Sequence, residues 1–267
     1  MRQLGSFFHI AMNGMAAADR MFDLLALEEE EDGTLDMVPA ADELKAKDLT
    51  LSYDGEKNAL ENLSFDVKGP QLVGIVGPSG SGKSTLAAVL SKQLKGYGGS
   101  LAFCDVELSQ TKEKSLLDHV TYLGAESYLM GGSVRELLAM ANPKASVAAM
   151  WDSLERVNLK EYFAAEDGLK TIIQSGGSNL SGGQRQRLSL AMALLHDTPV
   201  YIFDEVTSNI DVESEERIVG EIRALAETRL VLFISHRLAN VKDAGHLLVL
   251  NQGHLVEEGR HEELLEK

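Results

Sequence analysis

The segment GPSGSGKST, residues 77–85, constrains the fold of this chain more than any other part of the sequence. It matches the pattern G-x-x-x-x-G-K-[ST], and it stands between the apolar run QLVGIVG and a helical pattern. Glycines in such a loop let backbone N–H groups surround phosphates, while Lys83 can reach the β- and γ-phosphates and the Ser84 hydroxyl can bind Mg²⁺. We therefore expect a nucleoside triphosphate to bind this phosphate loop, through Gly77, Pro78, Ser79, Gly80, Ser81, Gly82, Lys83, Ser84 and Thr85.

A second apolar run, PVYIFDE, ends in two acidic residues at positions 204 and 205. A strand of this kind beside the phosphate loop would place the Asp204 carboxylate near the Mg²⁺. Glu205 follows at once and can accept a proton from an attacking water. The pair predicts hydrolysis of the bound triphosphate, with Asp204 and Ser84 as metal ligands and Glu205 as general base.

The composition narrows the class of protein. The chain has 267 residues and a formal net charge of −16, which argues against a nucleic-acid partner. Its single cysteine, Cys104, excludes a disulfide framework and fits a reducing compartment. Because no apolar run has the length of a membrane span and the N-terminus is not a signal peptide, we expect the chain itself to be soluble.

Hydrophobic periodicity predicts an α/β protein. Residues 1–27 read as one amphipathic helix, followed by an acidic linker to about residue 42. The segments 44–54 and 59–67 alternate like strands of a small antiparallel sheet, and the runs at 71–77, 200–204 and 230–235 resemble buried parallel strands. Residues 126–180 are rich in helical patterns, and 247–259 read as a strand, a turn and a strand.

The segment LSGGQRQR, residues 180–187, resembles the signature motif of ATP-binding-cassette (ABC) ATPases and stands about twenty residues before VYIFDE. Other family motifs follow in order over residues 44–267: Tyr53 resembles the aromatic residue that stacks on adenine, SNID (208–211) the D-loop with Asp211, and His236 the switch histidine. The resemblance implies a P-loop NTPase (RecA-like) core with a small antiparallel β subdomain and an inserted α-helical subdomain at about 126–190.

In this family two ATPase domains pair head to tail. The resemblance implies that the signature of one domain, here Ser181, Gly182, Gly183 and Gln184, holds the γ-phosphate bound at the partner's phosphate loop. It also implies ATP and Mg²⁺ as cofactors, and Lys83, Glu205 and His236 as the catalytic set.

Two positions depart from the family pattern. The Q-loop usually carries a glutamine where this chain has Ala125, and exporters usually carry an acidic residue where it has Ser175. Both loops face the membrane domain in the family. Either Glu126 takes the role of the glutamine or the site works without that contact, and a second negative charge near the γ-phosphate makes Glu126 the less favourable substitute.

The leading helix favours an exporter ATPase domain whose membrane-spanning domain precedes it, with residues 1–42 as stalk and linker and 43–267 as ATPase domain. RQLGSFFH…AAADRMFDLL is also similar to the stalk of bacterial heterodimeric exporters of cysteine and glutathione. The expected partners are ATP, a second ABC ATPase domain and a membrane-spanning domain, at the cytoplasmic face of the inner membrane. An importer subunit and a soluble ABC ATPase not coupled to transport remain the alternatives.

Overall fold

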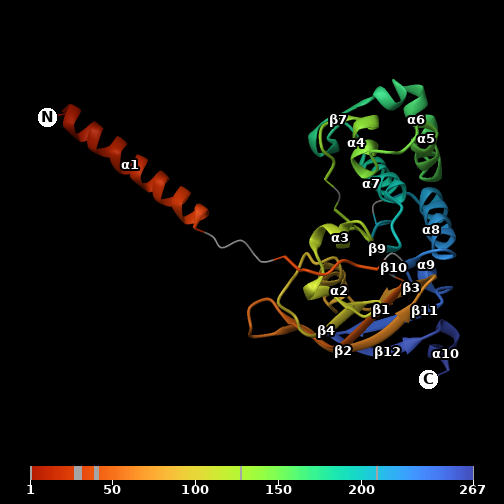
Figure 1. Ribbon diagram of the computed structural model, residues 1–267. Helices are drawn as coiled ribbons and strands as arrows, with labels where there is room; N and C mark the ends of the chain where they lie inside the picture. The colour runs from red at the N-terminus through yellow and green to blue at the C-terminus, as the bar shows by residue number, and fades with distance from the viewer. Residues whose placement is uncertain (1, 27–31, 39–41, 127, 209, 267) are drawn as a thin grey trace. The chain divides into compact units, whose positions relative to one another are not determined.

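The computed structural model describes residues 2–26, 32–38, 42–126, 128–208 and 210–266. Contacts within the chain divide it into two units, Met1–Asp32 and Gly33–Lys267. The first unit contains helix α1, Arg2–Leu25, which agrees with the helix predicted for residues 1–27 (Figure 1). Its apolar side chains from residue 11 onward are exposed, among them those of Met15 and Phe22, except that Ala18 is half-buried. Three apolar positions used in that prediction, Leu4, Phe7 and Phe8, have side chains outside the described set.

The second unit is built around a six-stranded sheet in the order β12-β11-β3-β10-β9-β6. Five of its strands are parallel, and β12 pairs antiparallel with β11 at one edge. The apolar runs of the sequence form β3, β9 and β10, which are buried on both faces as parallel strands require. The six strands are β3 (Gln71–Val76), β6 (Val120–Leu123), β9 (Val200–Asp204), β10 (Leu230–Ile234), β11 (His246–Asn251) and β12 (His254–Gly259).

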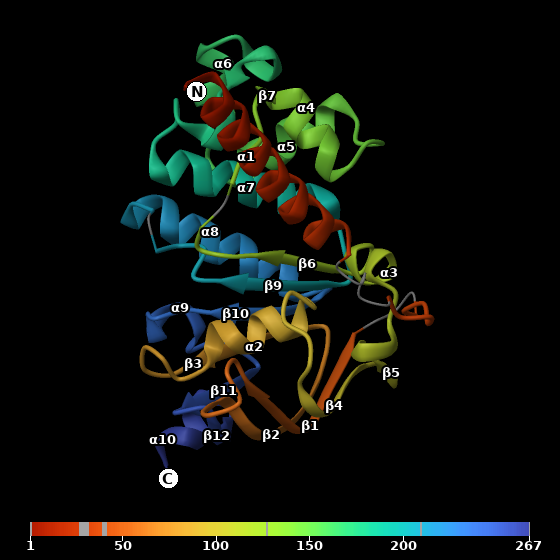
Figure 2. The ribbon, with the colours of Figure 1, turned by 90° about the vertical axis from the view of Figure 1, so that its left-hand side faces the viewer.

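A smaller antiparallel sheet, in the order β2-β1-β4-β5, packs beside one face of the large sheet. Helix α2, which begins at Lys83, lies against the same face, and a common apolar core joins the helix to both sheets (Figure 2). The predicted antiparallel segments are thus confirmed as β1 and β2. The elements on this side are β1 (Glu43–Ser52), β2 (Asn58–Lys68), α2 (Lys83–Leu90), β4 (Gly98–Phe103), β5 (Val106–Glu107) and α3 (Glu113–Leu117).

The opposite face of the large sheet is covered by helices, several of which form a separate cluster at one end of the unit (Figure 1). Serine caps start three of them, because the hydroxyl groups of Ser133, Ser146 and Ser181 accept first-turn N–H groups. Two short strands that are far apart in the sequence, β7 and β8, pair antiparallel and tie this cluster together. The sequence pattern did not indicate them. The elements are β7 (Gly132–Ser133), α4 (Val134–Ala141), α5 (Val147–Arg156), α6 (Lys160–Ala165), β8 (Ile172–Ile173), α7 (Gly182–His196), α8 (Val212–Ala226), α9 (Leu238–Val241) and α10 (His261–Leu265).

No helix among the described residues is long and apolar enough to span a membrane. The buried apolar side chains of the second unit form two cores, one on each face of the large sheet. Strand residues alternate between these cores, with Val200 and Ile202 on the α2 side and Tyr201 and Phe203 on the other. This alternation decides which side chains at the strand ends reach the phosphate loop.

Candidate functional site

The phosphate loop connects β3 to α2 and has backbone angles that only glycine adopts readily. Gly77 has φ 150° and Gly82 has φ 100°. A Cβ atom on Gly77 would lie 2.1 Å from the Leu250 carbonyl oxygen, and one on Gly82 would lie 2.8 Å from the Ala59 carbonyl oxygen. Both glycines are therefore required by backbone angle and by space, and the loop can approach a ligand closely.

Lys83 opens helix α2 with its side chain folded back over the loop. Its Nζ donates to the carbonyl oxygens of Gly77 and Pro78, each at 2.9 Å, and the residue is 4% exposed. The ammonium thus stands at the mouth of the loop, where the first N–H groups of α2 point. Ser81 is buried in the same loop, and its Oγ has no hydrogen-bond partner among the residues that the structure describes. This arrangement of ammonium, free hydroxyl and helix N-terminus suits a phosphate group.

Asp204 ends strand β9 beside the start of α2. Burial raises the pKa of its carboxyl group, while a hydrogen bond from Ser84 and the charge of Lys83 act in the opposite direction. Its Oδ1 is buried and receives no hydrogen bond from any described residue. An unpaired buried carboxylate oxygen next to a serine hydroxyl fits a divalent cation, which would neutralise the buried charge. Within the described ranges no three acidic, histidine or cysteine side chains cluster, so phosphate and water oxygens would complete this Mg²⁺ site.

Glu205 follows Asp204 with φ 57°, a left-handed backbone angle that is strained for a glutamate. Its N–H donates to the Ile234 carbonyl oxygen at 3.0 Å, which anchors it to β10. The Glu205 carboxylate lies 2.6 Å from Nε2 of His236, and the imidazole is half exposed. The structure thus joins two of the predicted catalytic residues, although they come from the ends of two different strands.

A cavity of about 320 Å³ is lined by Tyr53 and by six of the nine phosphate-loop residues. Tyr53 stands at its edge, 65% exposed, with its hydroxyl 3.1 Å from Thr85 Oγ1. The ring is therefore accessible to a stacking base. The residues around this cavity are Tyr53, Ala59, Ser79, Gly80, Gly82, Lys83, Ser84, Thr85, Glu205 and His236.

The signature residues do not line that cavity. Ser181 caps helix α7, accepting the Gln184 N–H at 3.2 Å while the Gln184 side chain accepts the Ser181 N–H at 2.8 Å. Ser181 and Gly182 are exposed, and Gly183 is half-buried. Of the D-loop, Asn209 lies outside the described residues, and Asp211 caps helix α8 by accepting the Ser214 N–H at 2.9 Å. The N-terminus of helix α7 is thus a second place suited to an anion, and it lies outside the cavity at the phosphate loop.

Two interactions at the site were missing from the sequence-based prediction. Gln186, 3% exposed on α7, donates from Nε2 to the Glu205 carbonyl oxygen at 3.3 Å. Arg237, next to His236, pairs with the buried carboxylate of Glu215 on α8. One indication of the role of Gln186 is present in the sequence: a polar residue stands at a helical position that the spacing of the apolar residues predicts to be buried.

Comparison with known proteins places the chain in a family. The family model described as "ABC transporter" matches residues 60–208, more than half of the chain. An "Uncharacterized ABC transporter ATP-binding protein" of Haemophilus influenzae is 42% identical over 269 residues, covering 100% of this chain and 48% of its own length. An "ATP-dependent lipid A-core flippase" of Vibrio vulnificus is 37% identical over 258 residues, covering 95% of this chain and 44% of the flippase.

A solved structure of a bacterial Atm1-family ABC exporter with ATP bound aligns with a TM-score of 0.89 and 29% identity, over 99% of this chain and 47% of that one. The chain spans about half the length of each of these proteins. None of the three is named as a heterodimeric exporter of cysteine or glutathione, and that finer resemblance of the leading helix has no support. The match to the family model agrees with the phosphate loop, the acidic strand end and the signature helix: the chain belongs to the ABC transporter family, as an ATP-binding domain.

Proposed function

We propose that this domain binds Mg²⁺ and ATP in the cavity at the phosphate loop and hydrolyses the ATP, and that this hydrolysis powers a membrane exporter. The observation that carries the proposal is the 2.6 Å contact between the Glu205 carboxylate and His236 Nε2, at the edge of the cavity that Lys83 and Ser84 line. A carboxylate held by an imidazole beside a phosphate cradle can take a proton from water.

Each residue then has a defined role. Lys83 and the loop N–H groups bind the phosphates, Ser84 and Asp204 hold the metal, and Tyr53 stacks on the base. The Mg²⁺ supplies charge neutralisation at the phosphate oxygens. Glu205 accepts the water proton, and His236 holds the Glu205 carboxylate in position.

The exposed N-terminus of α7 supports a head-to-tail dimer. The N-cap Ser181 and the first-turn residue Gly182 are exposed at the N-terminus of α7, away from the chain's own cavity, and a helix N-terminus favours an anion. We propose that they bind the γ-phosphate held by a second ABC ATPase domain. Loss of that phosphate on hydrolysis would release the contact between the two domains.

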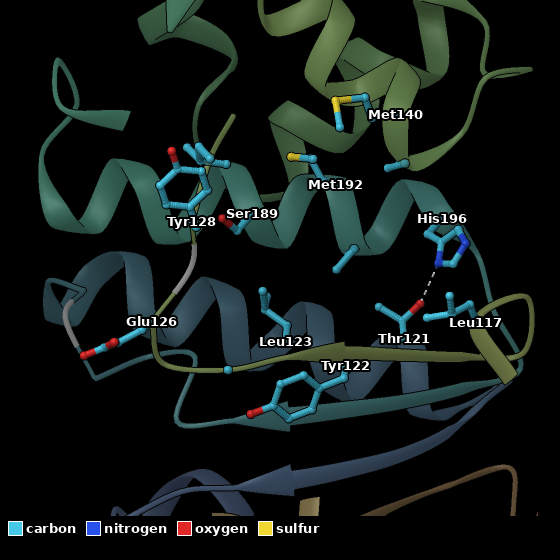
Figure 3. A pocket seen from close by; sticks show the side chains of 14 residues that line it. Leu117, Thr121, Tyr122, Leu123, Glu126, Tyr128, Met140, Ser189, Met192 and His196 are labelled. Atoms are coloured by element: carbon cyan, nitrogen blue, oxygen red, sulfur yellow. Dashed lines mark hydrogen bonds between the residues drawn. The ribbon is translucent and has the colours of Figure 1, made fainter. Parts of the chain in front are cut away.

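A groove of about 520 Å³ between β6 and the helices α4 and α7 supports a membrane-domain partner (Figure 3). Its lining includes the exposed apolar side chains of Leu117, Met140 and Tyr128. The two loops that depart from the family pattern meet here, because the Tyr128 hydroxyl lies 2.6 Å from the hydroxyl of Ser175 and Glu126 lies at the border. We propose that a cytoplasmic segment of a membrane-spanning domain binds this groove, which places the domain at the inner face of the membrane.

Glu205→Gln tests the hydrolysis proposal. It keeps the side-chain volume but removes the base, so phosphate release should fall by about 10²–10⁴-fold while ATP binding persists. Glu161→Gln, an equal charge change on the exposed surface of α6, is the matched control and should hydrolyse ATP at the parent rate. Undiminished phosphate release in Glu205→Gln would refute the assignment.

The dimer is tested in the same Glu205→Gln background by sedimentation with and without ATP. Trapped ATP should shift the chain from monomer to dimer, and the added change Ser181→Arg should abolish the shift because it blocks the phosphate contact. A dimer that survives Ser181→Arg unchanged would show that the signature does not bind the partner's phosphate.

A further inference from the structure

The neighbouring strands β6 and β9 bring one tyrosine close to the proposed metal ligand. Tyr122 lies opposite Ile202 in the parallel register, and Asp204 lies two residues beyond Ile202 on β9. Side chains two residues apart point to the same face of a sheet. Tyr122 and Asp204 are therefore diagonal neighbours on the α2 face, a separation of about 7–8 Å between residues that an aromatic side chain can bridge.

The Tyr122 ring packs against the apolar core on the α2 side, and its hydroxyl points toward the C-terminal end of β6, away from the groove side chains (Figure 3). A Cβ atom on Gly124 would lie 2.8 Å from that hydroxyl, so the small residue at 124 leaves the space that the phenol occupies. Gly124 follows β6 at the edge where Asp204 ends β9. The hydroxyl thus reaches the strand ends at which the metal site is built.

Two polar atoms are left unpaired there. The Tyr122 hydroxyl takes part in no hydrogen bond within the described part of the chain, and Asp204 Oδ1 is buried without one. Burial and the charge of Asp204 raise the pKa of Tyr122, so the phenol keeps its proton and remains a donor at neutral pH. An uncharged donor facing an unpaired carboxylate is complementary to a metal-bound water between them.

Glu126 is placed differently. It is exposed, borders the groove on the helical side of β6, and lies apart from the Tyr122 hydroxyl (Figure 3). To reach the metal site, Glu126 would have to leave that position and add a negative charge next to Asp204 and the phosphates. Ala125 has no polar atom to offer.

We propose that Tyr122 supplies the polar group that Ala125 lacks: its hydroxyl donates a hydrogen bond to a water bound to Mg²⁺ beside Asp204. This inference rests on the proposed function, since it assumes that Mg²⁺ and ATP bind at the phosphate loop. Tyr122 is then a positioning residue of the metal site. It belongs to strand β6, whereas Ala125 belongs to the loop that follows that strand. The ring itself would keep its packing in Tyr122→Phe, which removes only the hydroxyl.

The test measures binding of a fluorescent ATP analogue to Glu205→Gln protein, as a function of Mg²⁺ concentration and in excess chelator. Tyr122→Phe should raise the Mg²⁺ concentration needed for half-maximal binding by about three- to tenfold, the effect of one lost hydrogen bond, and leave binding in chelator unchanged. Adding Ala125→Gln should restore the parent Mg²⁺ requirement. Tyr162→Phe, which removes a hydroxyl from helix α6, is the matched control and should not change it.

An unchanged Mg²⁺ requirement in Tyr122→Phe, with the parent still binding in a Mg²⁺-dependent way, overturns the role of Tyr122 and leaves the proposed function intact. Equal weakening with and without Mg²⁺ also overturns it, because the hydroxyl would then serve the fold and not the metal. A shift in Glu126→Ala in place of Tyr122→Phe assigns the role to Glu126. Absence of any Mg²⁺-dependent binding in the parent refutes the proposed function and this inference together.

Discussion

Gln186→Met separates the stability of this domain from its activity. Gln186 donates one hydrogen bond, 3.3 Å long, to the Glu205 carbonyl oxygen, while its Oε1 is buried without a partner. Losing the hydrogen bond costs about 0.5–1.5 kcal/mol, and removing an unpaired buried oxygen returns about 1–3 kcal/mol. Methionine has a similar length and no polar atom to satisfy. The free energy of unfolding should therefore stay within about 1 kcal/mol of the parent value or rise by up to about 2 kcal/mol.

Activity should change in the other direction. Glu205 occupies a left-handed conformation that costs about 1–2 kcal/mol, and the Gln186 amide is one of the contacts that hold it. Weakening the hold by about 1 kcal/mol should lower kcat about three- to tenfold. KM for ATP should not change, because Gln186 does not line the cavity.

Urea denaturation and steady-state phosphate release measure the two quantities on the same Gln186→Met protein. Ser189→Ala is the matched control: Ser189 Oγ is also buried on α7 and, within the described part of the chain, makes no hydrogen bond with Glu205 or any other residue. That variant should gain stability and keep its kcat. Should Gln186→Met lose more than about 2 kcal/mol of stability, or keep the parent kcat, the reasoning about Glu205 is wrong.

Three further changes test other parts of the site. Gly82→Ala should lower the free energy of unfolding by at least about 1–2 kcal/mol, because φ is 100° and the new Cβ would lie 2.8 Å from a carbonyl oxygen of β2. Gly220→Ala, on helix α8 where nothing lies near the new Cβ, should stabilise the domain. The measured Tm should therefore fall in the first variant and rise in the second, and equal shifts would contradict this reasoning. Burial raises the pKa of Asp204, so its ionised form weakens folding at pH 7 and this cost fades as the pH falls through that pKa. Asp204→Asn should therefore raise the urea midpoint of the metal-free chain at pH 7 but not near pH ~4, and a pH-independent gain would argue against it. Arg237→Met should cost about 1–3 kcal/mol by leaving buried Glu215 short of a donor, and adding Glu215→Gln should recover much of the loss in the same urea assay.

The sequence predicted those parts of the site whose geometry is local. The phosphate loop could be located because its glycines, lysine and hydroxyl lie within nine consecutive residues, between a strand and a helix. The acidic end of β9 could be predicted because a continuous apolar run indicates a buried parallel strand, and the carboxyl ends of parallel strands meet at one edge. The signature motif could be located for the same reason, because its residues are consecutive, at positions 180–187.

The sequence did not predict contacts that depend on how distant segments pair. Tyr122 meets the site only because β6 lies beside β9 in a particular register, and the two strands are far apart along the chain. Gln186 contacts Glu205 only because α7 crosses the end of β9, which the apolar period of a helix does not indicate. The strands β7 and β8 pair across three intervening α-helices, and with two residues each they are too short to show an alternating pattern.

Strand β6 contributes to both proposed binding sites, the groove and the metal site. It can do so because successive side chains of a strand point to opposite faces of the sheet. All three residues Thr121, Tyr122 and Leu123 border the groove, but Leu123 packs into the core on the α7 side, whereas the Tyr122 ring packs against the core on the α2 side, the face on which Asp204, the proposed metal ligand, lies. A small displacement of β6 by a protein segment in the groove would therefore move the Tyr122 hydroxyl relative to Asp204. Because packed strands transmit displacement with little compression, the groove and the metal site need no flexible connector between them. If both proposed sites are occupied as argued, three consecutive side chains of β6 would couple partner binding in the groove to the metal at Asp204. That coupling would run through the strand and not through the altered loop that begins at Ala125.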